Sequence, residues 1–199
     1  MSKVRLVVVG NGMVGHRFIE ELIERADPGR YEITVFGAEP RPAYDRVHLS
    51  SYFSHHTSED LSLVKPGFYD KHGIRLLLGE AVKKIDRATR EVHSNKGTVV
   101  GYDKLVLATG SYPWVPPIQG SQHHECFVYR TIEDLKAIRS AAKSGKSGVV
   151  IGGGLLGLEA ANGLALRGMD VTVVHIADWI MERQLDRTGG KMLQAELEN

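Results

Sequence analysis

Gly10-Asn11-Gly12-Met13-Val14-Gly15 is the stretch of sequence that decides the fold. It has the pattern G-x-G-x-x-G and directly follows Val4–Val9, a nearly continuous apolar run typical of a strand buried on both faces. Apolar residues then recur at helical spacing until Asp27-Pro28-Gly29 interrupts them. In such a strand–loop–helix unit the first glycine makes a tight turn, the second lets the backbone approach a pyrophosphate, and the third allows close packing. This context favours a dinucleotide-binding loop over an ordinary glycine-rich turn.

The same arrangement occurs a second time in the chain. The strand-like segment Gly148–Ile151 leads into Gly152-Gly153-Gly154-Leu155-Leu156-Gly157, and a helical segment and the strand-like Val171–Val174 follow. Two such loops in one short chain are far more specific than either alone. We therefore predict an α/β fold with two Rossmann-like units, each with its own dinucleotide site.

The remaining elements can be placed around these two units. Strand patterns lie at 32–36, 74–78, 81–85, 91–94, 98–100 and 105–108, and those from 74 to 100 are typical of a meander. Residues 37–67 are polar, aromatic and irregular, and loops of that length are usually functional or disordered. Thr131, with Asp134 three residues on, predicts a capping box that begins a helix near 132–143. The prolines at 113, 116 and 117 indicate a stiff crossover, so we predict domains at 1–117 and 118–199.

The residue that ends the second strand of each unit should contact the ribose. An acid there accepts hydrogen bonds from the 2′-hydroxyl and repels a 2′-phosphate. In the first unit Glu39 is the candidate, with a solvated loop carboxylate as the alternative. In the second unit His175 occupies this place, so the sequence leaves the choice between NADH and NADPH open.

Composition and charge argue against several functional classes. The 199 residues include 25 Lys+Arg and 24 Asp+Glu without a block of either sign, so we expect neither a nucleic-acid nor a membrane partner. No apolar run approaches the roughly 20 residues that span a bilayer, and the first ten residues do not resemble a signal peptide. A single cysteine, Cys126, excludes an intrachain disulfide and favours a reducing, cytoplasmic setting.

Histidine pairs and the cysteine are the remaining candidates for metal or thiol chemistry. Adjacent side chains diverge on a strand or a helix, and no further ligand stands at metal-binding spacing. We therefore expect His55-His56 and His123-His124 to be exposed loop residues, and we predict no metal site. Cys126 lies in Glu125–Val128, which has the pattern of a half-buried strand, so we expect a small buried hydrophobe rather than a nucleophile.

In chain order, Gly10–Gly15, Ala108-Thr109-Gly110 and Gly152–Gly157 resemble the FAD-dependent pyridine-nucleotide oxidoreductase superfamily. Within it, essentially the whole chain is similar to the N-terminal part of assimilatory NAD(P)H nitrite reductase large subunits. Three segments carry this closer resemblance: Ala43–Ser54, Thr109–Trp114 and Met181–Asp186.

The resemblance implies an FAD-binding Rossmann-like domain with a β-meander, followed by a second Rossmann-like NAD(P)-binding domain that is incomplete at residue 199. FAD would lie on Gly10, Asn11, Gly12, Met13, Val14 and Gly15, with Ala108, Thr109, Gly110 and Arg130 near the flavin and the Val82 backbone near the adenine. NAD(P)H would lie on Gly152, Gly154, Leu155, Leu156 and Gly157, with His175 at the ribose.

Two positions depart from the pattern of these relatives. They often have an acid where this chain has Ala38 and a lysine where it has Ser51. We therefore give the ribose role to Glu39 and treat Arg46 as a candidate flavin-side cation, with a loop salt bridge as its alternative.

The resemblance also implies a function. Residues 43–54 lack the redox cysteines of the disulfide-reductase branch, so we expect hydride transfer from NAD(P)H to flavin, with no catalytic side chain. The chain would be an electron-input module for nitrite reduction to ammonium, feeding a downstream redox domain or a small nitrite reductase subunit. Sirohaem and an iron–sulfur cluster would lie beyond residue 199, because one cysteine cannot hold a four-cysteine cluster. The alternatives are a stand-alone ferredoxin- or rubredoxin-type reductase, or a truncated FAD-binding module without turnover. The oligomeric state stays open.

Overall fold

The computed structural model describes residues 2–27, 29–54 and 57–198, and the chain divides into two compact units. The first comprises Met1–Arg46 and Glu59–Tyr112, and the second comprises Val47–Ser58 and Pro113–Asn199. The division at residue 117 into an FAD-binding and an NAD(P)H-binding domain stays a prediction. Within the described ranges, no helix has the length and apolar character needed to cross a bilayer.

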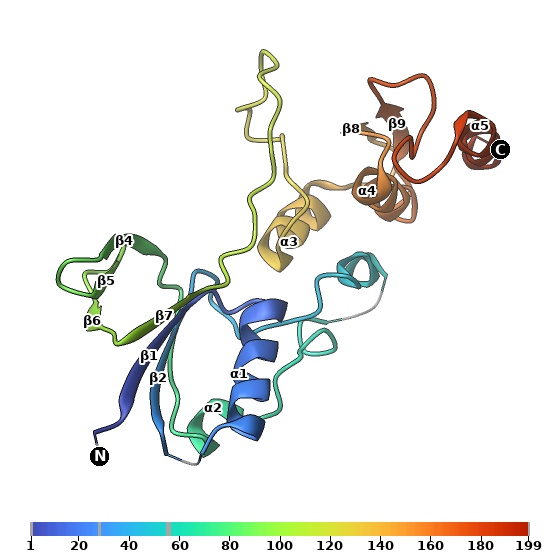
Figure 1. Ribbon diagram of the computed structural model, residues 1–199. Coiled ribbons are helices and arrows are strands. Elements are labelled where there is room, and N and C mark those ends of the chain that lie inside the picture. Colours follow the sequence, from blue (N-terminus) through green and yellow to red (C-terminus); the bar gives the residue numbers. More distant parts are fainter. Residues whose placement is uncertain (1, 28, 55–56, 199) are drawn as a thin grey trace. The chain divides into compact units, whose positions relative to one another are not determined.

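A parallel sheet of four strands forms the centre of the first unit (Figure 1). Its order is β3 (Arg75–Leu78), β2 (Tyr31–Gly37), β1 (Val4–Val9) and β7 (Lys104–Leu107). From β1 the chain crosses through α1 (Met13–Arg25) to β2, whereas β7 lies on the other side of β1. The order of the strands therefore reverses at β1. In open α/β sheets ligands bind at the carboxyl ends of strands at such a point, which is where Gly10–Gly15 lies.

Alternate residues of β1 pack into two different cores. Leu6 and Val8 belong to the core that includes Ile19 of α1, and the short helix α2 (Phe68–Lys71) adds Tyr69 to it. Val7 and Val9 belong to the core that includes Val92 of the meander. The predicted meander is an antiparallel sheet of β4 (Val82–Asp86), β5 (Glu91–Ser94) and β6 (Val99–Gly101). Burial on both faces explains why β1 is apolar apart from Arg5 near its beginning.

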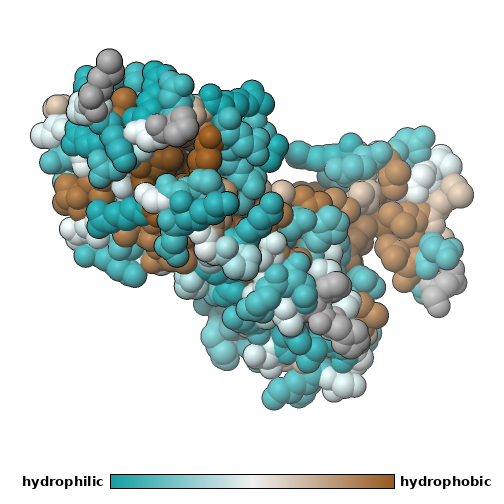
Figure 2. Space-filling model, turned by 90° about the horizontal axis from the view of Figure 1, so that it is seen from below, coloured by the Kyte–Doolittle hydropathy of each residue, from teal (hydrophilic) through white to brown (hydrophobic). Residues whose placement is uncertain are grey.

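The second unit contains the other predicted strand–loop–helix–strand arrangement. Strands β8 (Ser147–Ile151) and β9 (Asp170–Val174) pair in parallel and are joined by α4 (Leu155–Ala165). Helix α3 (Ile132–Ala141) precedes them and α5 (Arg187–Leu197) follows. Apolar residues reach the surface in several places (Figure 2), and in this pair of strands they are Val149, Ile151 and Val174.

The predicted capping box is confirmed at the start of α3. The Asp134 N–H donates to the Thr131 hydroxyl over 3.1 Å, and the Thr131 N–H donates to the Asp134 carboxylate over 2.7 Å. Two of the unpaired N–H groups at this helix end are thereby satisfied, one by each partner. The shorter side chain of aspartate therefore serves where glutamate or glutamine is usual.

The segment predicted as one irregular loop contains an ordered 3₁₀-helix, η1 (Leu49–Phe53). The Phe53 ring stacks on Tyr129 with 6.0 Å between ring centroids, and the Arg139 guanidinium donates to the Tyr52 carbonyl over 3.2 Å. A Cβ atom on Gly163 of α4 would lie 2.4 Å from the Phe53 ring, so α4 accepts this ring only because it has a glycine there. The prediction of an irregular loop is thus wrong for these residues, because a few aromatic side chains anchor a segment whose average composition is polar.

The prediction of a half-buried strand at 125–128 is also wrong. These residues have no regular secondary structure, and Cys126 is exposed. The N–H of Cys126 donates to the His123 carbonyl over 2.9 Å, and the N–H of His123 donates to the Gly120 carbonyl over 2.9 Å. Local turns therefore engage backbone groups that a neighbouring strand would have needed.

Candidate dinucleotide sites at two glycine loops

Two glycines of the first loop are required by the fold itself. Gly10 has a φ of 113°, and a Cβ atom on it would lie 2.1 Å from the Ala108 carbonyl oxygen. A Cβ atom on Gly15 would lie 2.0 Å from the Gly10 carbonyl oxygen. Gly12 differs, because its backbone is extended and a Cβ atom would meet nothing within 4 Å. No contact with the described residues explains a glycine at this position, whereas a pyrophosphate close to the backbone would.

The second loop repeats this geometry. Gly152 has a φ of 118°, and a Cβ atom on Gly157 would lie 1.8 Å from the Gly152 carbonyl oxygen. Gly154 has an extended backbone, and a Cβ atom on it would meet nothing within 4 Å. The middle glycine of each loop therefore leaves open space at the beginning of a helix, which a side chain would fill.

The two helices that follow these loops begin without a side-chain cap. The N-cap residues of α1 and α4 are Gly12 and Gly154, and neither helix has an acidic residue in its first turn. By contrast, Thr131 caps α3 and Asp186 caps α5 through their side chains. The first N–H groups of a helix carry a positive partial charge and bind phosphate. Open space and an uncapped helix end at the same place fit a dinucleotide pyrophosphate at each loop.

The strand end Ala108-Thr109-Gly110 lies beside the first loop. The Ala108 N–H donates to the Val9 carbonyl over 2.8 Å, and the Ala108 Cβ lies 3.5 Å from the position of a Cβ atom on Gly15. Gly110 has a φ of 68°, which turns the chain away after β7. Two segments far apart in sequence, both predicted to hold FAD, are thereby brought together.

Glu39 and Arg46 form an ion pair with each other. The Glu39 carboxylate also accepts a hydrogen bond from the Tyr44 hydroxyl over 2.7 Å, and the Arg46 guanidinium lies 4.9 Å from the centre of the Tyr44 ring. The loop salt bridge considered for Arg46 is therefore present, and its partner is the predicted ribose ligand. The pair fixes the Glu39 carboxylate just after β2, and its role at the ribose stays a prediction.

Val82 and Arg130 lie in different units. Val82 begins β4 and packs against the core of Val9 and Phe36. Arg130 precedes α3 in the second unit, where its N–H donates to the Asp134 carboxylate over 3.1 Å. Their predicted contacts with adenine and flavin stay predictions.

His175 follows β9 directly and lies against the second loop, and its predicted role at the ribose stays a prediction. Its Nδ1 accepts a hydrogen bond from the Gly153 N–H over 3.0 Å, and its Nε2 lies 3.0 Å from the Glu182 carboxylate. Glu182 was not among the predicted site residues. The turn of residues 175–182 brings Glu182 to the second loop, and no short motif in the sequence predicts this contact.

With this geometry in place, comparison with known proteins decides the family. The pattern described as pyridine nucleotide-disulphide oxidoreductase matches residues 4–199. The chain belongs to this family. Its members use FAD and NAD(P)H, and the predicted superfamily and α/β fold class are confirmed.

Individual relatives give a more specific picture. The chain is 59% identical over its whole length to the nitrite reductase (NADH) large subunit of Escherichia coli and covers 24% of that protein. It is 46% identical over its whole length to the assimilatory nitrate reductase electron transfer subunit of Bacillus subtilis and covers 26% of it. Among solved structures, a covalent putidaredoxin reductase–putidaredoxin complex matches with a TM-score of 0.85 and 30% identity, over 98% of this chain and 48% of that one. The chain thus spans about a quarter of the length of these curated relatives.

This member of the pyridine nucleotide-disulphide oxidoreductases has a buried polar group beneath its first loop. Asn11 Nδ2 donates to the Tyr69 hydroxyl over 2.6 Å, and that hydroxyl lies 3.1 Å from Nδ1 of His16. Burial lowers the pKa of His16, with Glu20 partly offsetting the effect, and burial raises the pKa of Tyr69. His16 is therefore neutral near pH 7, and its Nδ1 accepts a hydrogen bond from the Tyr69 hydroxyl, which helps to fix Asn11 in the loop.

The buried His16 predicts a pH dependence of stability. Its pKa in the folded chain lies below its value of about 6.5 in the unfolded chain, so the unfolded state binds more protons below that pH. The free energy of unfolding should consequently fall as the pH is lowered from about 7 to about 5. Urea unfolding across this range measures the effect. His16→Gln should flatten the dependence and His72→Gln, at an exposed site, should not; an unchanged slope in His16→Gln would contradict the assignment.

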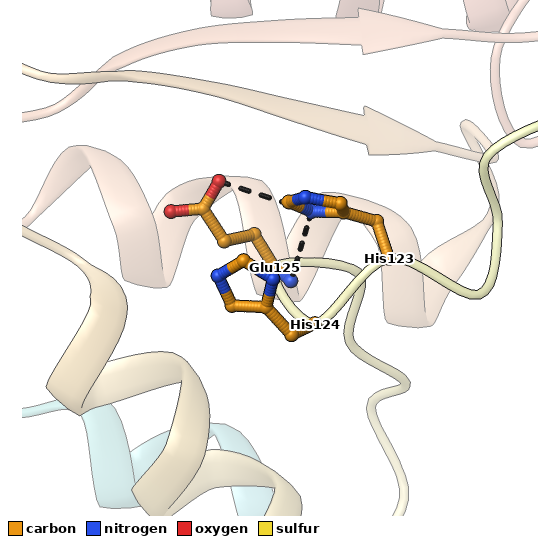
Figure 3. Close-up of side chains that lie close together, drawn as sticks. All are labelled: His123, His124 and Glu125. Atoms are coloured by element: carbon orange, nitrogen blue, oxygen red, sulfur yellow. Dashed lines mark hydrogen bonds and ion pairs between the residues drawn. The ribbon is translucent and has the colours of Figure 1, made fainter.

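The family comparison gives no role to the histidine pairs, and the structure corrects one expectation about them. His123 and His124 do not diverge, because their segment turns, and their ring centroids lie 4.2 Å apart (Figure 3). Candidate ligand atoms of these residues and Glu125 lie within 4.8 Å of one another, and all three side chains are exposed, which was predicted for the two histidines. The Glu125 N–H donates to Nδ1 of His123 over 3.3 Å, and the absence of a metal site here stays a prediction. His55 and His56 lie outside the described residues.

Proposed function

We propose that this chain is the cofactor-binding part of an electron-input module that passes electrons from NAD(P)H through FAD to a metal centre elsewhere in the protein. The observation that carries the proposal is the repeated cradle, in which Gly12 and Gly154 leave open space before an uncapped helix. Two such cradles in one chain suit two dinucleotides. The similar proteins from Escherichia coli and Bacillus subtilis support nitrite reduction to ammonium, in nitrate assimilation, as the process served.

In this proposal the residues of the chain bind and orient the cofactors. When bound, FAD supplies the redox chemistry, since it accepts an electron pair from NAD(P)H and releases electrons singly. The domain 1–117 holds FAD through Gly10–Gly15, the Ala108–Gly110 segment and the Glu39–Arg46 pair. The domain 118–199 holds NAD(P)H through Gly152–Gly157.

The final electron acceptor would lie outside this chain. Six electrons are needed to reduce nitrite to ammonium, and a single cysteine cannot ligate a four-cysteine cluster. We therefore place sirohaem and the iron–sulfur cluster in a downstream domain, with a small nitrite reductase subunit as the other possible partner. A protein with this cofactor set and one cysteine in this chain would work in the cytoplasm.

A stand-alone reductase for a small redox protein is the second candidate. It is favoured by the structural similarity to the putidaredoxin reductase complex, at a TM-score of 0.85 and 30% identity. Such an enzyme would share both cradles and would deliver electrons to a separate protein.

Anaerobic reduction of bound FAD by NADH tests the proposal. The complete protein, as its gene encodes it, is loaded with FAD and mixed with NADH, and the visible absorbance of the flavin is followed. We expect rapid bleaching and, on addition of nitrite, reoxidation with formation of ammonium. Bleaching that is reversed only by an added ferredoxin or rubredoxin would favour the stand-alone reductase. FAD that binds but is never reduced by NADH or NADPH would overturn both and leave a binding module without turnover.

A further inference from the structure

Strand β9 ends without an acidic residue, yet a carboxylate lies beside its end. Nδ1 of His175 accepts the hydrogen bond of the Gly153 N–H, so this nitrogen carries no proton. The proton of the neutral imidazole is therefore on Nε2, which points to the Glu182 carboxylate 3.0 Å away. Loop backbone, imidazole and carboxylate form one chain of hydrogen bonds.

The segment that carries Glu182 is tied to the same loop residue. The Met181 N–H donates to the Gly153 carbonyl over 2.9 Å, so both backbone polar groups of Gly153 are engaged by residues 175–182. Ile180 is buried, and its side chain lies 2.8 Å from the position of a Cβ atom on Gly153. Met181 has a φ of 57°, an uncommon conformation for a residue other than glycine, which turns the chain so that Glu182 faces His175. The position of Glu182 is thus fixed relative to the nucleotide loop.

We propose that Glu182 is a specificity-determining residue that makes this protein prefer NADH over NADPH. This inference rests on the proposed function, because it concerns the nucleotide that the second loop binds. The adenosine ribose of a bound dinucleotide lies near the end of the second strand, which here is β9. His175 holds the Glu182 carboxylate there, and the Glu182 side chain is 33% exposed against 12% for His175. A fixed carboxylate at this place accepts hydrogen bonds from the ribose hydroxyls and repels a 2′-phosphate.

Two other roles for these residues make different predictions. If Glu182 only supports the loop through His175, its loss would weaken NADH and NADPH equally. If the neighbouring exposed Arg183 decided the choice, its guanidinium would attract a 2′-phosphate and the protein would prefer NADPH. The ratio of the two affinities, rather than either affinity alone, separates these roles from a specificity-determining carboxylate.

Glu182→Gln is the direct test, because the amide oxygen can still accept from His175 Nε2 while the charge is removed. Binding of NADH and NADPH, and of 5′-ADP and 2′,5′-ADP, is measured by anaerobic calorimetry on the complete FAD-loaded protein after its flavin has been reduced with dithionite, so that hydride transfer adds no heat. We expect wild type to bind NADH and 5′-ADP at least about tenfold more tightly than their 2′-phosphorylated counterparts. In Glu182→Gln this preference should largely disappear, through a gain in affinity for the phosphorylated ligands. The preference of wild type should also shrink as salt is added, because the repulsion is screened.

Glu196→Gln, the same change at an exposed position of α5, is the matched control and should keep the wild-type ratio. An unchanged ratio in Glu182→Gln, equal losses for both nucleotides, or a wild-type preference for NADPH would overturn the inference while leaving the proposed function intact. Wild-type protein that binds neither nucleotide would overturn the proposed function, and the inference with it.

Discussion

Replacing Gly12 with valine is expected to lower the affinity for FAD by at least about a hundredfold while the chain still folds. In the free chain a Cβ atom on Gly12 has no neighbour within 4 Å and the backbone there is extended, so the first atom of the new side chain fits without a clash. The free energy of unfolding should change by no more than about 1 kcal/mol, the size of a poorer N-cap. In the complex, the two added methyl groups would occupy the space of the pyrophosphate. Fluorescence titration with FAD and urea unfolding measure the two quantities.

Gly154→Val is the matched control, because it makes the same change at the same position of the second loop. Its Cβ atom also meets nothing within 4 Å. This variant should keep the wild-type affinity for FAD and lose binding of NAD(P)H, whereas Gly12→Val should do the reverse. Equal affinity for FAD in wild type and Gly12→Val would refute the assignment of the first loop, and loss of FAD in both variants would refute the division of labour between the loops.

The fold was largely predictable because its signals are local. The run Val4–Val9 is apolar apart from Arg5 since both faces of β1 are buried, and each glycine loop lies between a strand and a helix. Capping of α3 by Thr131 also involves residues only three apart. Such features are set by spacing along the chain and require no knowledge of distant segments.

What escaped prediction depends on segments that meet only after folding. Tyr69 and Asn11 are 58 positions apart in the sequence, and no pattern in either segment predicts their hydrogen bond. Phe53 anchors η1 in a stretch whose average composition is polar. The contact of this one ring with Gly163 holds the segment in place although the surrounding residues are polar. Cys126 is followed by apolar residues in the sequence, yet hydrogen bonds of a local turn leave it exposed.

The backbone framework of the candidate site followed from the sequence, whereas the pairing of its charged residues did not. Both loops and the Ala108–Gly110 strand end lie where expected, because steric limits force glycine at Gly10 and Gly15. The pairing of Glu39 with Arg46 and of Glu182 with His175 followed from loop conformation. Loop conformation is not encoded by a short motif, so for His175 the sequence left the nucleotide choice open.

A single methyl group on Gly157 is expected to destabilise the second unit by at least about 3 kcal/mol. The Cβ atom of alanine there would lie 1.8 Å from the Gly152 carbonyl oxygen, far inside contact distance, so α4 must move away from the loop. Alanine favours helix over glycine by up to about 1 kcal/mol, which cannot offset a clash with backbone. Urea unfolding followed by tryptophan fluorescence measures the effect, since both tryptophans, Trp114 and Trp179, lie in this unit. Gly154→Ala, which adds the same methyl group in open space of the same loop, should unfold within about 1 kcal/mol of wild type. Equal stability of the two alanine variants would show that glycine is needed at position 157 for a reason other than the close approach of α4 to Gly152.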